Sequence, residues 1–103
     1  MLTKIKDADG NEFKVHGYGL KALNKALKEA RFDGELEGTG EMTVNEAATM
    51  KLYLARMGGF RDPQVRKHHG IIQGFIRFLG RALKTGKGLT LERNKKAPPA
   101  DAE

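Results

Sequence analysis

The sequence predicts an α+β fold in which a small antiparallel sheet packs on about three helices. Apolar and polar residues alternate near both ends of the chain, as in half-buried strands. Between these ends, apolar residues recur at helical spacing. The chain has 103 residues, the length of a single domain. We expect one globular domain over residues 1–93 and a disordered tail over residues 94–103, which are polar and contain prolines.

The first 16 residues are expected to form a β-hairpin. Ile5, Phe13 and Val15 alternate with lysines in residues 2–6 and 12–16, so that the apolar side chains share one face. The connecting sequence DADGN contains Asp-Gly, which is a strong signal for a tight turn between two strands.

The segment GYGLKALNKALKEARF has the pattern of an amphipathic helix. Its apolar face comprises Leu20, Leu23, Ala26, Leu27 and Ala30, and its opposite face Lys21, Lys25 and Lys28. We expect this helix to stop near residues 32–34. The next segment, GELEGTGE, has three glycines and is interpreted as a loop, with a short strand inside it as an open alternative.

A capping box marks the start of a second helix. Thr43 and Glu46 have the spacing at which each side chain bonds the backbone amide of the other. The helix EAATMKLYLARM is expected to end at Gly58-Gly59. Its inward face comprises Ala47, Met50, Leu54 and Met57. Leu52 does not fit that face.

The third helix is expected to begin at Asp62-Pro63 and to run to about Lys84, because Asp is a good N-cap and Pro suits the first helical position. Placed on a helical wheel, residues 65–84 show a wide apolar stripe, which is typical of the central helix of a small domain. The residues on the opposite face are Arg66, Arg77, Arg81 and Lys84.

Gly70, Gly74 and Gly80 lie on or near this basic face. A glycine inside a helix costs roughly 1 kcal/mol relative to alanine. Three glycines therefore indicate close approach by a phosphate backbone, another helix or a sheet, or else a break in the helix. After this helix, Leu89 and Leu91 alternate with polar residues and predict a third strand beside the hairpin.

Positive charge is concentrated in the C-terminal half of the chain. The net charge is +6. Residues 1–42 carry seven basic and eight acidic side chains, whereas residues 43–96 carry twelve basic and three acidic ones. This asymmetry is typical of a chain with a polyanionic partner, and it also fits a basic surface that faces an acidic protein.

We expect nucleic acid, either DNA or RNA, as the partner of the basic half, with most contacts made to phosphates. The residues expected to bind are Arg56, Arg61, Arg66, Lys67, Arg77, Arg81 and Lys84. Two helices joined by GGFRD also resemble a helix-turn-helix, in which Gln64 and residues 66–68 would face base edges. Tyr53 and Phe60 are the aromatic candidates for stacking on bases.

No enzymatic activity, cofactor or metal is expected. The chain has no cysteine, and no signature of a nucleophile with its base or of a nucleotide-binding loop occurs. The stretch DADGNEFKVHGY begins like a calcium loop, but Glu12 and Tyr18 stand where glycine and glutamate are required, so it is interpreted as a turn. His68 and His69 are adjacent and diverge on a helix, which disfavours a shared metal ion.

The main alternative is a protein-binding module that acts as a component of a larger assembly or as an inhibitor or adaptor of another complex. The charge asymmetry fits this hypothesis as well, and the glycines of the last helix would allow self-association. A basic helix with Phe and Leu also suits a membrane surface, but here other elements are available to pack against it, so membrane binding is not expected. The N-terminal sequence MLTKIKDADG lacks the apolar core of a signal peptide, which predicts a cytoplasmic protein.

Overall fold

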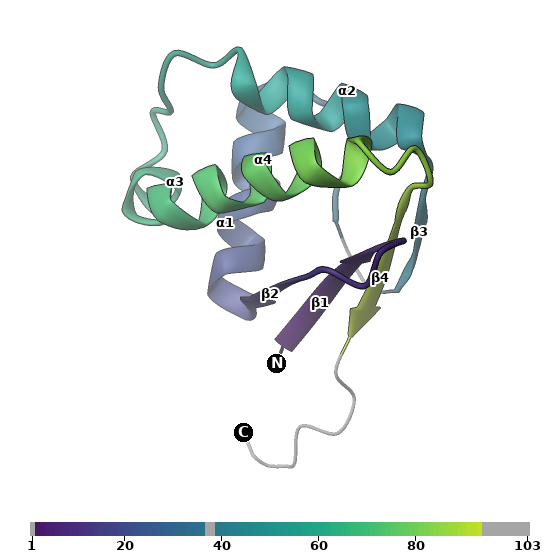
Figure 1. Cartoon of the computed structure of the whole chain (residues 1–103). Helices are drawn as coiled ribbons and strands as arrows, with labels where there is room; N and C mark the ends of the chain where they lie inside the picture. The colour runs from purple at the N-terminus through teal and green to yellow at the C-terminus, as the bar shows by residue number, and fades with distance from the viewer. Residues whose placement is uncertain (1, 37–38, 94–103) are drawn as a thin grey trace.

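The computed structural model describes residues 2–36 and 39–93 and confirms the α+β class. A four-stranded antiparallel sheet lies on one side of the molecule, and the helices pack together on the other (Figure 1). The strands are β1 (Leu2–Asp7), β2 (Glu12–His16), β3 (Gly40–Met42) and β4 (Leu89–Arg93). The helices are α1 (Gly17–Glu29), α2 (Val44–Ala55), α3 (Pro63–Lys67) and α4 (His69–Leu83). The tail expected at residues 94–103 lies outside the described residues.

The strand order is β2-β1-β4-β3, so the C-terminal strand lies in the middle of the sheet. Ile5 in β1 pairs with Phe13 in β2 and with Leu91 in β4, which confirms both the hairpin and the third strand. The end of the segment GELEGTGE forms the short strand that its sequence allows, because Gly40 and Glu41 of β3 pair with Leu91 and Thr90 of β4 at the edge of the sheet.

The two faces of the sheet differ in burial and charge. Ile5, Val15 and Leu91 are buried on the face covered by the helices, as the alternation of the sequence predicts. The outer face carries lysines and glutamates on neighbouring strands. Its ion pairs are Lys6–Glu12 (4.0 Å), Lys6–Glu92 (3.4 Å) and Lys14–Glu12 (3.8 Å). The charges of this face therefore largely neutralise one another.

The hairpin turn is organised by the carboxylate of Asp7. Its Oδ1 accepts hydrogen bonds from the backbone amides of Asp9 and Asn11, each at 2.9 Å, and its Oδ2 accepts one from the Asn11 side chain at 2.9 Å. Burial alone would raise the pKa of Asp7. The hydrogen bonds from Asn11 and Asp9 and the nearby charge of Arg81 outweigh burial, so the pKa lies below its ordinary value. The stretch is a turn, as interpreted from the sequence.

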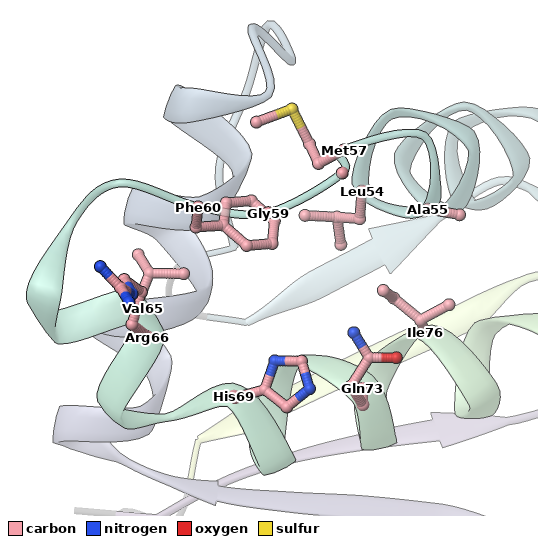
Figure 2. Close-up of a pocket in the computed structure, with 11 residues that line it drawn as sticks. Leu54, Ala55, Met57, Gly59, Phe60, Val65, Arg66, His69, Gln73 and Ile76 are labelled. Carbon is pink, nitrogen blue, oxygen red and sulfur yellow. The ribbon is translucent and has the colours of Figure 1, made fainter.

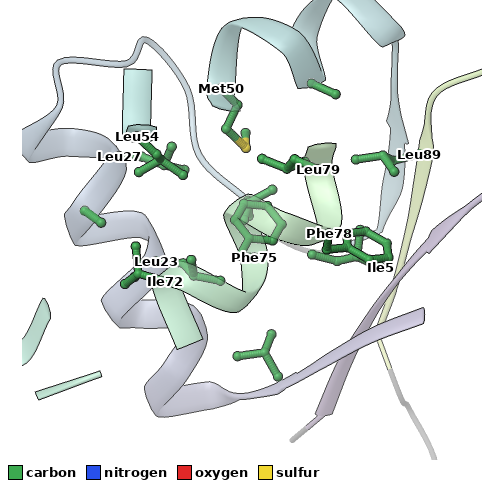
Figure 3. Close-up of a cluster of buried hydrophobic side chains, with 14 of the residues drawn as sticks. Ile5, Leu23, Leu27, Met50, Leu54, Ile72, Phe75, Phe78, Leu79 and Leu89 are labelled. Atoms are coloured by element: carbon green, nitrogen blue, oxygen red, sulfur yellow. The ribbon is translucent and has the colours of Figure 1, made fainter. Parts of the chain in front are cut away.

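The hydrophobic core lies between the helices and the sheet, with Phe75 of α4 at its centre. Phe75 is fully buried, and its ring centroid lies 5.4 Å from that of Phe13 on β2. Figure 3 shows Phe75 in a cluster to which α1 contributes Leu23, α2 contributes Met50 and β1 contributes Ile5. The wide apolar stripe of the sequence thus marks the central helix of the domain.

The helix α1 forms where predicted but ends at Glu29, before residues 32–34. Arg31 adopts the left-handed backbone conformation, with φ 66°. The amides of Arg31 and Phe32 then donate to two late carbonyls of the helix at 3.0 and 2.9 Å. This pair of bonds is a Schellman termination, whose left-handed position is usually glycine. The sequence places the end of this helix too late, because the position that ends it is occupied by an arginine and not by the glycine that usually marks such an end.

The capping box of α2 is present as predicted. The Thr43 hydroxyl accepts a hydrogen bond from the Glu46 amide at 3.1 Å, and the Glu46 carboxylate accepts one from the Thr43 amide at 2.9 Å. The helix ends at Ala55, before the expected Gly58-Gly59. Leu52, which does not fit the apolar face of the sequence, is 58% exposed.

The prediction of one continuous helix over residues 63–84 is wrong, because the chain breaks at His68 into α3 and α4. His68 has φ −106° and ψ 32°, outside the helical range. The His68 amide donates to the Gln64 carbonyl at 3.3 Å, and Nδ1 of its ring lies 2.8 Å from the same oxygen. The two segments differ in their main neighbours, since α3 packs against α1, whereas α4 packs chiefly against α2 and also against α1 and β2. Gly70, just beyond the break, weakens helix formation locally.

Two of the three glycines in α4 allow close packing. A Cβ atom at Gly74 would lie 3.5 Å from the Phe13 ring, and one at Gly80 would lie 3.1 Å from the Lys51 side chain. The sheet and α2 therefore occupy the space beside these two positions. A Cβ atom at Gly70 would meet nothing within 4 Å, so the open glycine is the one at the helix break.

Candidate nucleic-acid interface

Three of the expected binding residues form one row along α4. Arg77 and Arg81 belong to the helix and Lys84 is its C-cap residue, and all three side chains are exposed. A helix rises 1.5 Å per residue, so the row spans about 10 Å along the helix axis. The opposite side of α4 packs into the core. Arg81 lies near the Asp7 carboxylate at the hairpin turn. We refer to Arg77, Arg81 and Lys84 as the α4 row.

Arg66 and Lys67 do not continue the α4 row. Both are exposed but belong to α3, and the break at His68 ends the helical wheel that placed Arg66 with Arg77. The break also overturns the helix-turn-helix hypothesis. The helix after the GGFRD segment has only five residues, too few for a recognition helix that lies along a groove.

Arg56 and Arg61 lie beside an arginine that was not expected to take part. Arg31, Arg56 and Arg61 line one concavity of about 530 Å³, together with Glu29, Ala30, Met57 and Gly59. Arg31 follows α1, Arg56 is the C-cap of α2, and Arg61 belongs to the segment between α2 and α3. We call Arg31, Arg56 and Arg61 the arginine cluster.

A second concavity, of about 470 Å³, opens between α2 and the α3–α4 segment and is drawn in Figure 2. Leu54, Phe60 and Ile76 give it an apolar floor, and Arg66 and His69 supply its basic groups. No acidic residue lines it among the described residues. We call it the α2–α4 groove. It shares Met57 and Gly59 with the concavity of the arginine cluster, so the two hollows flank the same loop.

The seven expected binding residues differ in their charge pairing from Lys6 and Lys14 of the sheet. All seven are exposed. Within residues 2–36 and 39–93, none of them takes part in an ion pair, since the ion pairs of this part join Lys6 and Lys14 to glutamates of the sheet. Apart from Arg81, whose charge acts on the nearby Asp7 carboxylate, these side chains therefore present cations without a paired carboxylate in the described part of the chain.

The adjacent histidines have separate environments. The ring of His68 faces the Gln64 carbonyl, whereas His69 lines the α2–α4 groove. In the part of the chain that the structure describes, no three metal-binding side chains of His, Cys, Asp or Glu come together.

The two aromatic candidates for base stacking, Tyr53 and Phe60, are partly covered by neighbouring residues. Phe60 is half-buried in the α2–α4 groove, and Tyr53 lies beneath the Arg56 guanidinium, whose carbon is 4.3 Å from the ring centroid. Tyr18 at the start of α1 is 79% exposed and was overlooked as a candidate for base stacking. Arg31 was overlooked too. The sequence carries no signal for it, because Arg31 lies inside the segment predicted as helix and its left-handed conformation is seen only in the structure.

Comparison with protein-family models, curated proteins and solved structures gave no match to this chain. None of the helices within the described ranges is both long enough and apolar enough to cross a membrane.

Proposed function

We propose that the protein is a non-enzymatic accessory protein that binds DNA or RNA through phosphate contacts from its helical side. The proposal is supported by the contrast in charge pairing. The outer face of the sheet holds lysines in ion pairs with glutamates, whereas the seven exposed cations of the helical side have no such partners within the described residues. Unpaired cations can replace the counterions condensed on a nucleic acid. A cytoplasmic location belongs to the same proposal and is supported by a chain without cysteine.

The test is a fluorescence-anisotropy titration with labelled duplex DNA and with single-stranded RNA, repeated across a salt series. We expect Kd to rise steeply with salt, because each neutralised phosphate contributes roughly one unit to the log–log slope. Binding that is absent at low salt for both probes would overturn the proposal.

The α4 row is tested by the combined variant Arg77→Glu, Arg81→Glu and Lys84→Glu. We expect its affinity to fall by at least about tenfold and its salt slope to decrease, because up to three phosphate contacts are lost. The matched control is Lys21→Glu, Lys25→Glu and Lys28→Glu, which changes the net charge equally on the exposed side of α1. Equal losses in both variants would show that net charge, and not the α4 row, governs binding.

The second candidate function is that of a protein-binding module, as a component of an assembly or as an inhibitor or adaptor. The α2–α4 groove favours it, because an apolar floor with basic groups suits a partner segment that carries apolar and acidic side chains. Self-association is included in this candidate.

The two candidates differ in their response to salt and to groove substitutions. A partner held in the groove should stay bound as salt increases, and Phe60→Ala should release it while the charge reversals on α4 do not. Affinity capture with the wild-type chain, repeated with Phe60→Ala at low and high salt, makes this comparison. Loss of capture on α4 charge reversal alone would speak against the groove.

A further inference from the structure

The arginine cluster consists of three arginines from separate parts of the chain that line one concavity. Arg31, Arg56 and Arg61 line the same concavity of about 530 Å³, and none forms an ion pair within the described residues. Arginine presents several N–H donors in a fixed fork that matches the oxygens of a phosphate. Three such forks around one hollow are suited to a compact oxyanion.

Among the described residues, one acidic side chain, that of Glu29, lines the concavity, and it already accepts hydrogen bonds from backbone amides. The Glu29 carboxylate accepts hydrogen bonds from the amides of Arg61 at 2.6 Å and of Asp62 at 3.2 Å, one at each oxygen. These bonds attach the segment before α3 to the end of α1. Glu29 therefore positions Arg61 through its backbone, and the guanidinium of Arg61 is not its hydrogen-bond partner.

Arg56 is held in place before any ligand arrives. Its guanidinium stacks over Tyr53, which in turn meets Phe32 edge-on with ring centroids 5.8 Å apart. Stacking uses the flat face of a guanidinium and leaves its N–H edges available to donate hydrogen bonds. A donor that is fixed in advance loses little freedom when it binds.

Arg31 occupies a position where folding favours a different residue. It lies in the left-handed conformation at the end of α1, which glycine adopts more readily. The side chain is exposed, so core packing does not require it. Backbone amides already satisfy the late carbonyls of α1, so the guanidinium is not needed as a cap. Its side chain lines the concavity.

We propose that the arginine cluster is a binding site for a single phosphate group. The site goes beyond the α4 row and does not depend on it. The link to nucleic acid, in which the phosphate would be the terminal phosphate of a strand, rests on the proposed function. The same chemistry would also hold free phosphate or a small phosphate ester.

The first experiment titrates the ¹⁵N-labelled full chain with inorganic phosphate at constant ionic strength set by chloride. We expect saturable shifts in the NMR signals of Arg31, Arg56, Gly59 and Arg61. Arg31→Gly should weaken phosphate binding by about tenfold, as expected for loss of one charge-assisted contact. Arg31→Lys should weaken it less, because the charge remains while the fork is lost.

The control variant is Lys21→Gln, which removes one positive charge from the exposed side of α1 and should leave phosphate affinity unchanged. Arg61→Gln provides a second test, because it keeps the backbone amide that Glu29 holds and removes only the guanidinium. Shifts that do not saturate, or phosphate binding that survives both Arg31→Gly and Arg61→Gln, would overturn the site.

The second experiment compares oligonucleotides that differ only in a 5′-phosphate or a 5′-hydroxyl. A preference for the phosphorylated strand that disappears in Arg31→Gly supports the terminal phosphate as the ligand. Equal binding of both strands, beside saturable binding of inorganic phosphate, supports a small phosphate compound. If the chain binds inorganic phosphate but neither duplex DNA nor RNA, the proposed function is wrong and the phosphate site stands. The variant with Arg77→Glu, Arg81→Glu and Lys84→Glu should lose affinity for nucleic acid and keep its affinity for inorganic phosphate.

Discussion

At the residue scale, one carboxylate determines the geometry of the hairpin turn. Asp7 accepts hydrogen bonds from the amides of Asp9 and Asn11 and from the Asn11 side chain, and it is 6% exposed. A charged acceptor with several donors stabilises the turn more than a neutral one would. The low pKa of Asp7 follows from this, because the folded turn favours the ionised carboxylate even though burial opposes it.

Stability should therefore depend on pH through Asp7. Because its pKa is lower in the folded than in the unfolded state, the stabilisation is fully present above the unfolded value of about 3.9 and is lost as pH falls through the folded pKa. Asp7→Asn should lower the free energy of unfolding by about 1–2 kcal/mol at pH 7 and reduce its decline below pH 4. Urea unfolding between pH 2.5 and 7 measures both effects. Asp9→Asn, in the same turn, is the control, and a decline as steep in Asp7→Asn as in the wild type would contradict the assignment.

Arg31 makes a second prediction at this scale. A residue with a side chain costs about 1 kcal/mol or more in the left-handed conformation, where glycine is readily accommodated. Arg31→Gly should therefore raise the free energy of unfolding by about 1 kcal/mol, which corresponds to a rise in Tm of about 5 °C for a domain of this size. Thermal unfolding measures the change. An unchanged or lower Tm would show that the Arg31 side chain stabilises the fold through contacts.

At the scale of elements, α4 serves the core and the surface at once. Phe75 and Ile72 are buried on one side, and the α4 row is exposed on the other. The break at His68 allows this arrangement, because α3 can follow α1 while α4 lies against α2 and the sheet. Gly74 and Gly80 lie where Phe13 of the sheet and Lys51 of α2 come close to α4. A substitution at either glycine therefore tests how tightly α4 packs against its neighbour.

Two glycine substitutions should have opposite effects. Gly74→Ala places a Cβ atom at ordinary contact distance from Phe13 and should stabilise the protein by up to about 1 kcal/mol through helix propensity. Gly88→Ala should destabilise it by about 2 kcal/mol or more, because residue 88 has φ 88° and its Cβ atom would lie 2.6 Å from the Met42 carbonyl oxygen. Urea unfolding of both variants makes the comparison. A stable Gly88→Ala protein would show that β3 moves easily away from the start of β4.

At the scale of the whole molecule, the sequence predicts what depends on local pattern. The capping box of Thr43 and Glu46, the Asp-Gly turn and the alternation around Leu89 and Leu91 are visible in short windows, and each is confirmed. For the helix that begins at Pro63, the glycines left a break open as an alternative, but the local pattern did not place it at His68, where the backbone leaves the helical range. The strand β3 has only three residues and is defined by pairing with β4, far away in sequence.

In the candidate site, too, the sequence predicts the part that depends on local spacing and misses the part that depends on packing. The exposure of the α4 row follows from helical spacing within one segment, and the sequence suffices to group Arg77, Arg81 and Lys84. The arginine cluster joins residues 31, 56 and 61, which only the packing of α1 against the later helices brings to one hollow. Comparing the net charge of residues 1–42 with that of residues 43–96 does not reveal the arginine cluster, because Arg31 belongs to the first part, whose charges are nearly balanced.

The place of β4 in the sheet bears on how the chain folds as it leaves the ribosome. The pairing of β1 with β4 joins Thr3 to Arg93, almost the full length of the described chain. Until the last strand emerges, the nascent hairpin has an unpaired edge at β1, and β3 has no neighbour at all. The sheet can therefore close only after residues 89–93 have been synthesised, and closing so long a loop between β1 and β4 is expected to slow folding.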